Sequence, residues 1–347
     1  MIYWIYAVAI LVWLCFIKRK TSDAQTSVFS KNDTLCLKGI AALLVVLHHL
    51  GQYLTADDKI HFNGYMGGVS VGIFFMLSAY GLYKAGKKKG YYQRIFMVKI
   101  PALYLYQVLM NILYYLLFFT QEYKTVGKVL PRILNVDFLC GMSRLNGFSW
   151  FISTILITYA VFGVVLFAWE KWGENCKNKR FWFACSGTVW AVLWYVLVSV
   201  TPIDALYSRS IFCFAIGAWT AVFEKEIVQF LQPQKRFWLI CIGAAVLMTV
   251  CFFLFAEQVA CVAVCVFIVI FFAKFHCRST SVYAFLGQIS LEIYLVQKMF
   301  FLIFPFRQFW GEGVLIILCT LLTAVVFHWL IDRIKRLQQS SLKKKNT

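Results

Sequence analysis

The chain has 347 residues, of which 61% are hydrophobic and only 14% are charged. Soluble domains are nearer to half apolar and a quarter charged, so this composition excludes an ordinary soluble protein. The formal net charge of +19 at first suggests a nucleic-acid partner.

Apolar runs that approach or reach the length of a membrane-spanning helix recur from one end of the chain to the other. The eleven runs are residues 2–17, 34–54, 67–84, 99–119, 148–169, 181–200, 209–223, 237–255, 258–274, 282–305 and 313–331. They predict an all-α, polytopic integral membrane protein with about eleven transmembrane helices. The spans use nearly all the chain, which leaves no room for a second soluble domain.

The basic residues are distributed unequally between alternate loops. One set of loops, with the segment after residue 331, holds 25 of the 34 lysine and arginine residues, whereas the other set holds 7. This bias predicts that the first set is cytoplasmic, with the N-terminus outside and the C-terminus inside. The charge therefore reflects orientation in the lipid bilayer, and we expect no nucleic-acid partner.

The first run has no basic residue before it and three directly after it, Lys18, Arg19 and Lys20. A secretory signal has the opposite polarity, so we interpret residues 1–33 as an uncleaved anchor helix with a cytoplasmic linker. Residues 34–331 form the main membrane domain, and residues 332–347 form a basic cytoplasmic tail.

The twelve cysteines are scattered, mostly within the spans, and none forms a CxxC pair. Their spacing predicts neither a disulfide framework nor a metal site. We interpret them as small apolar packing residues.

Three ionisable side chains lie in the second apolar run, where residues 38–50 are KGIAALLVVLHHL. Lys38 and His49 are eleven positions apart, so they share one helix face and lie about 16 Å apart along its axis. Two interpretations of Lys38 stay open: its ammonium extends to the inner membrane surface, or it binds a ligand. We interpret His48 as a structural residue, whereas the face that His49 shares with Lys38 favours a role in proton transfer.

Lys38, Ala41, Val45 and His49 resemble the first-core-helix motif of the acyltransferase-3 family of integral membrane acyltransferases, Arg-x-x-Ala-x-x-x-Val-x-x-x-His. Lysine stands here in place of arginine, which keeps the charge but loses the bidentate geometry.

Four further segments resemble that family in the same order along the chain. They are GVSVGIFFMLSAYGL at 68–82, YYQRIFMVKIPALYL at 91–105, WFISTILITY at 150–159 and FLGQISLEIYLVQ at 285–297. Ala79 stands where the family usually has glycine, and Gln297 stands where it has histidine. The resemblance implies a ten-helix core with both ends cytoplasmic, to which the first span is an addition.

The resemblance also implies an activity. The family transfers an acyl group, often acetyl, from coenzyme A to a hydroxyl of a carbohydrate or related surface molecule. We therefore expect acetyl-CoA or another acyl-CoA as co-substrate, no permanently bound cofactor, and an extracytoplasmic carbohydrate acceptor. The composition and the family point to a multi-pass protein of the bacterial inner membrane, and the sequence does not predict an oligomeric state.

The polyanionic donor needs fixed positive charge on the inner side of the membrane. Lys38, Arg94 and Lys99 are the candidates for acyl-CoA binding, with Ser78 as a further candidate whose alternative is a hydrogen bond within its own helix. The lysine run 87–89 fits the general positive charge of cytoplasmic loops better. His49 is the candidate general base or acyl carrier.

Glu292 is the second catalytic candidate, because a carboxylate within a span needs a partner. It could orient a histidine or pair with Lys298. Asp137 and Arg144 in the long outer loop 120–147, with Trp150 at its edge, are the candidates for acceptor binding. The alternative function is a transporter or glycan-export protein without acyltransferase activity, a possibility that the departures at Lys38 and Gln297 keep open.

Overall fold

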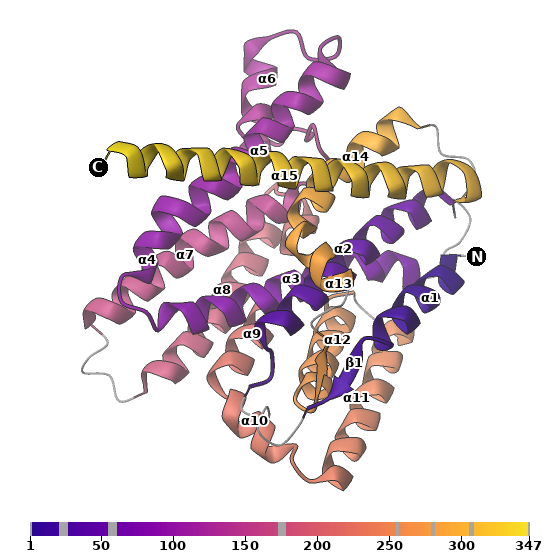
Figure 1. The fold of residues 1–347 in the computed structure, drawn as a ribbon, viewed down its shortest axis with the longest axis vertical. Helices are drawn as coiled ribbons and strands as arrows, with labels where there is room; N and C mark the ends of the chain where they lie inside the picture. Colours follow the sequence, from indigo (N-terminus) through magenta and orange to yellow (C-terminus); the bar gives the residue numbers. More distant parts are fainter. Residues whose placement is uncertain are drawn as a thin grey trace.

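A computed structural model describes residues 2–20, 27–54, 61–172, 178–254, 257–278, 282–304 and 309–345. The chain is built almost entirely from helices (Figure 1). The longer helices are α1 (Ile2–Leu14), α2 (Lys31–Leu54), α3 (His61–Gly86), α5 (Ile100–Tyr114), α7 (Trp150–Trp172), α8 (Lys179–Val200), α9 (Phe212–Val222), α11 (Gln234–Leu254), α12 (Glu257–Phe272), α14 (Ser290–Ile303) and α15 (Val314–Lys345).

Shorter elements connect these helices. They are β1 (Ile17–Arg19), α4 (Tyr91–Arg94), the π-helices η2 (Ile95–Lys99), η3 (Tyr115–Phe119) and η7 (Phe309–Gly313), α6 (Val126–Ile133), the 3₁₀ helices η4 (Asp137–Cys140) and η6 (Ala205–Ser208), α10 (Glu224–Phe230), β2 (Phe275–Cys277) and α13 (Val282–Gln288). In Figure 1, α6 lies at the top of the molecule and α10 at the bottom.

Each of the eleven predicted runs overlaps a helix. Among the described residues, eight helices are long and apolar enough to cross a membrane, and a ninth is added if α13 and α14 count as one span. These helices confirm a nearly all-α protein with many membrane spans. The number eleven and the orientation of the two ends remain predictions.

The predicted helix 282–305 is broken in the structure at Ile289, where α13 and α14 meet at 78°. The hydroxyl of Ser290 donates to the Gly287 carbonyl across this break, at 3.0 Å. The apolar pattern did not predict the break because both halves are equally hydrophobic.

Two glycines allow α13 to lie directly against α2. A Cβ added to Gly39 would lie 1.9 Å from the Tyr283 carbonyl oxygen, and one added to Gly287 would lie 1.9 Å from that of Leu35. The two backbones are therefore in contact, as small residues permit between membrane helices. This contact places the break at Ile289 beside the first half of α2.

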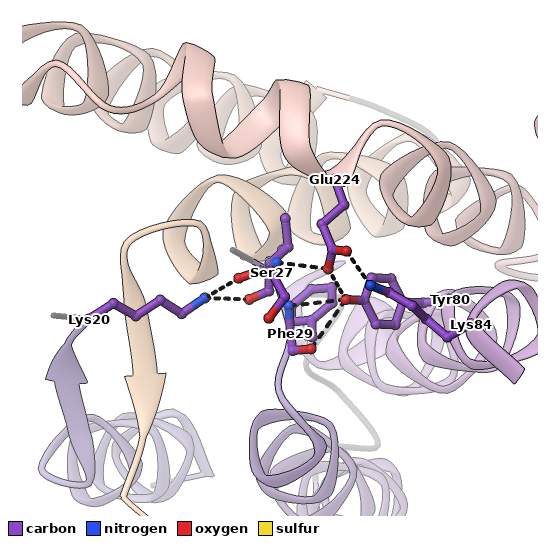
Figure 2. A network of polar contacts seen from close by, with 7 residues as sticks. Lys20, Ser27, Phe29, Tyr80, Lys84 and Glu224 are labelled. Atoms are coloured by element: carbon purple, nitrogen blue, oxygen red, sulfur yellow. Dashed lines mark hydrogen bonds and ion pairs between the residues drawn. The ribbon is translucent and has the colours of Figure 1, made fainter. Parts of the chain in front are cut away.

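A buried polar network holds the segment before α2 against the rest of the bundle (Figure 2). The Lys20 ammonium donates to the carbonyls of Ser27, Val28 and Phe272 at 2.6, 2.8 and 2.6 Å. Burial lowers the pKa of Lys20 from 10.5 to about 8, and attraction from Asp33 and Glu224 opposes that shift. Three carbonyl acceptors compensate for the water that this ammonium loses.

Glu224, the first residue of α10, is the centre of the same network. Its carboxylate accepts a hydrogen bond from the Val28 amide at 3.0 Å and another from the Tyr80 hydroxyl, and it forms an ion pair with Lys84. Glu224 thus joins α3, α10 and the segment before α2 (Figure 2).

The start of α2 is defined by a capping box. The Asp33 amide donates to the Ser30 hydroxyl at 3.1 Å, and the Ser30 amide donates to the Asp33 carboxylate at 2.8 Å. Asp33 also accepts the Cys277 amide of β2 at 2.6 Å. Because β2 pairs antiparallel with β1, the end of α1, the start of α2 and the end of α12 are joined at this point.

We predict that Gly287→Ala separates α2 from α13 and destabilises the protein. Overpacking typically costs about 1–3 kcal/mol, and the neighbouring atom is a backbone carbonyl that cannot rotate away. The control is Gly81→Ala on α3, where an added Cβ meets nothing within 4 Å. Thermal unfolding in detergent should show a lower melting temperature for Gly287→Ala than for the unaltered protein, and no decrease for Gly81→Ala. Equal melting temperatures would contradict the close contact.

Candidate active site

A cavity of about 430 Å³ lies between α2, α3, α5, α7, α14 and α15. Its walls combine aromatic and aliphatic side chains with a small set of polar groups. The polar lining includes Lys38, Ser78, Lys99, Tyr159, Glu292 and His328. Pockets that bind small molecules typically have this composition, an apolar wall with a few convergent polar groups.

Lys38 and Lys99 supply the positive charge of this cavity. Lys38 lies on α2, seven positions after the start of the helix, and it is half-buried. The Lys99 ammonium lies 5.3 Å from the ring centre of Tyr91 and 5.4 Å from that of Tyr159. These distances are within the range of cation–π attraction, which holds the ammonium at the cavity wall. The structure therefore brings together two of the predicted donor-binding residues.

Ser78 also lines the cavity. Its hydroxyl is the acceptor of a long hydrogen bond, 3.4 Å, from the Tyr159 hydroxyl. Arg94, in contrast, is exposed on α4 and does not line this cavity. Of the four residues predicted to bind acyl-CoA, Lys38, Ser78 and Lys99 share one site.

Glu292 contacts a histidine that the sequence did not single out. The Glu292 carboxylate, 5% exposed, lies 2.9 Å from Nδ1 of His328 on α15. Nε2 of His328 lies 3.9 Å from the Asp332 carboxylate. Of the two partners considered for Glu292, the structure has a histidine and not Lys298, whose ammonium lies 5.0 Å from the Phe148 ring centre.

His328 escaped sequence analysis because its partner is 36 positions away in another helix. The available signal was an ionisable residue near the end of an apolar run, which also fits an interfacial residue. Only the packing of α15 against α14 makes it part of the cavity.

His49 lies outside this cavity, further along α2. Its Nδ1 is 3.1 Å from Oε1 of Gln52, and its ring stacks on Phe148 with centroids 3.5 Å apart and planes 8° apart. The neighbouring His48 is buried and tilted by 57° against it.

Tyr294 connects the cavity with the surroundings of His49. Its side chain lines the cavity, and its hydroxyl donates to the carbonyl of Phe148, the residue that stacks on His49. The Gln297 side chain is fully buried nearby. Its amide nitrogen donates to the Tyr294 carbonyl at 3.2 Å, while its oxygen has no hydrogen-bond partner among the described residues.

The predicted acceptor-binding residues lie apart from the cavity. Arg144 forms a 2.8 Å ion pair with Asp204, and its guanidinium lies 5.0 Å from the Tyr207 ring centre. Trp150 is buried at the first position of α7. Asp137 is 1% exposed, and its Oδ2 has no hydrogen-bond partner within the described part of the chain.

No group of three or more histidine, cysteine, aspartate or glutamate side chains that could hold a metal ion is found in the described ranges. The polar groups of the cavity wall include two ammonium groups, a carboxylate–imidazole pair and the hydroxyls of Ser78 and Tyr159. Such groups can bind an anion and move a proton.

The family model for acyltransferase 3, described as an acyltransferase domain, matches residues 36–333. The chain therefore belongs to this family of membrane acyltransferases, as the five sequence motifs predicted. No curated protein and no solved structure matches the chain.

Asp137 gives a prediction for pH dependence. Burial raises the pKa of this carboxyl from 3.8 to about 6, although Arg144 and Arg132 oppose the shift. Because the folded-state pKa is the higher one, the stabilising contribution is complete below about pH 4 and is lost as the pH rises through about 6.

Thermal unfolding between pH 4 and pH 7 tests this contribution. We expect the melting temperature to fall more steeply with pH in the unaltered protein than in Asp137→Asn, whose side chain does not ionise. Asp204→Asn is the control, because Asp204 is half exposed and paired with Arg144. Parallel curves for Asp137→Asn and the unaltered protein would rule out this effect.

Proposed function

We propose that the protein transfers an acyl group, most simply acetyl, from a cytoplasmic acyl-CoA to a hydroxyl of an extracytoplasmic saccharide. The observation that carries the proposal is the cavity in which Lys38 and Lys99 face the Glu292–His328 pair. Family membership supports acyl transfer, and the two ammonium groups suit a polyanionic donor. The apolar wall suits the acyl end of that donor.

The positions of the polar groups suggest different roles. Lys38 and Lys99 bind the donor electrostatically, and the neighbouring hydroxyls of Ser78 and Tyr159 supply hydrogen bonds to it from the cavity wall. Glu292 holds the His328 ring through its contact with Nδ1. We assign His328, which lines the cavity, the role of giving a proton to the leaving thiolate.

His49 is the proposed base for the acceptor. Its imidazole would take the proton from the acceptor hydroxyl as that oxygen attacks the thioester carbonyl. The carbon–sulfur bond then breaks, and the departing thiolate is protonated to give free coenzyme A. Because the axial distance from Lys38 to His49 is about 16 Å, the donor must extend along the α2 face towards Tyr294 and Phe148.

Binding of the donor can be tested without knowing the acceptor. Acetyl-CoA at roughly a hundred times its dissociation constant should add about 2.7 kcal/mol to the stability of the detergent-purified protein. We expect Lys38→Met to reduce this stabilisation strongly. Lys31→Met is the control, because it removes an exposed ammonium from the same helix and Lys31 does not line the cavity. If acetyl-CoA does not stabilise the unaltered, folded protein, the export function becomes the better explanation.

The two histidines can be separated by their effects on transfer. We expect His49→Gln to lower the transfer of labelled acetyl groups to envelope saccharides by roughly 10²–10⁴-fold, because a general base contributes that much. Acetyl-CoA should still stabilise this variant, since the cavity is unchanged.

His328→Gln, assayed in parallel, is expected to reduce acyl transfer. In this variant, a further substitution of Glu292 should reduce transfer less than it does in the unaltered protein. Full transfer by His49→Gln would contradict its role as base. Loss of transfer in His328→Gln alone would assign that role to His328.

A further inference from the structure

A second cavity, which we call the lysine cavity, lies where α3 and α7 end and α8 begins. It measures about 750 Å³ and shares no lining residue with the candidate active site. Five lysines line it: Lys87, Lys88, Lys89, Lys171 and Lys179. Among the described lining side chains Glu170 is the only acid, and its carboxylate already accepts the Gly90 amide at 2.8 Å. The cavity therefore carries a large excess of positive charge.

This charge converges from three separate segments. Lys87, Lys88 and Lys89 follow α3, Lys171 lies in the last turn of α7, and Lys179 begins α8. The inward bias of basic loops requires positive charge on one side of the membrane, but it does not require lysines from different segments to surround one hollow. Partial burial and the neighbouring Lys84 lower the pKa of Lys87, as expected where like charges are crowded.

An apolar groove continues from the lysine cavity along the outer surface of α7 and α8. Its volume is about 370 Å³, and it shares Trp169 and Lys179 with the cavity. Trp172 and Trp182, which are 66% and 60% exposed, form its mouth. It continues to Val165, seven positions before Trp172, and to Ser186, seven positions after Lys179, so it reaches about 10 Å further into candidate membrane spans.

The groove offers almost nothing polar to a ligand. The Ser186 hydroxyl already donates to the Trp182 carbonyl at 2.8 Å, which leaves Lys179 and the indole N–H groups of the lining tryptophans as polar contacts, all of them donors. A nucleotide base could stack on the tryptophans, but its own N–H donors would lose water and meet only the Ser186 hydroxyl as a side-chain acceptor in the groove. A hydrocarbon chain has no such requirement. Exposed tryptophans are also typical of the membrane–water interface.

We propose that the lysine cavity and the apolar groove together bind an anionic phospholipid. The phosphate of the headgroup lies among the five lysines, and one acyl chain lies between α7 and α8. The charges are complementary, and the groove extends from the phosphate position into the bilayer, as the covalent structure of a phospholipid requires. The lipid would thereby join the ends of α3, α7 and α8.

A lipid titration of the detergent-purified full-length protein tests this proposal. We expect dioleoyl phosphatidylglycerol to raise the melting temperature, and dioleoyl phosphatidylcholine, with the same chains but no net charge, to have little effect. The variant Lys171→Gln/Lys179→Gln should require a roughly 30-fold higher concentration of phosphatidylglycerol. The charge-matched control is Lys31→Gln/Lys235→Gln, which removes two exposed lysines outside the cavity.

A third variant, Ala168→Leu, fills the groove without changing the charge. It should weaken the effect of phosphatidylglycerol and should melt normally without added lipid. Equal responses to the two lipids would overturn the proposal. So would unchanged phosphatidylglycerol titrations for both Lys171→Gln/Lys179→Gln and Ala168→Leu. It would also be overturned if coenzyme A, and not phosphatidylglycerol, stabilised the protein through Lys171 and Lys179, because the cavity would then be a nucleotide site.

Discussion

The backbone contact between α2 and α13 is the constraint on which the candidate active site depends. Gly39 lies next to Lys38, and Gly287 lies two positions before the break at Ile289. Any larger side chain at either glycine would push the two helices apart. Because α14 begins directly after the break, the same contact determines where Glu292 lies relative to Lys38. The close approach at the two glycines thus brings Lys38 of α2 and Glu292 of α14 to the same cavity.

The ionisable groups of the interior illustrate a second constraint. A charge that is removed from water needs partners, and the described network around Glu224 supplies them from three segments. Glu292 is paired with His328 in the same manner. The cavity lysines differ, because Lys99 faces aromatic rings and Lys38 faces the cavity. An anionic ligand in the cavity would supply the negative charge that compensates these two ammonium groups.

The sequence predicted the helices well because hydropathy alone identifies long apolar segments. It also predicted the family. Of its candidate site residues, Lys38, Ser78, Lys99 and Glu292 line one cavity, whereas Arg94 and His49 do not, and their roles stay predictions. It missed the break at Ile289 and the partner of Glu292. Both arise from contacts between segments far apart in the chain, and a single sequence contains no direct signal for them. The catalytic role of His49 stays a prediction, since His49 does not line the cavity and would meet the donor only if the donor extends along α2.

The ribbon of β1 and β2 has a consequence for biosynthesis. Ile17 pairs with Cys277, so the two strands cannot meet until nearly all of the intervening helices have left the ribosome and entered the membrane. Until then, the backbone groups of β1 and the ammonium of Lys20 lack the partners that β2 and Phe272 supply. Although α1 is made long before β2, it is therefore fixed in place only after β2 has been made. Because the pairing of β1 with β2 closes such a long loop, the ribbon forms only in a chain whose intervening helices have already been made.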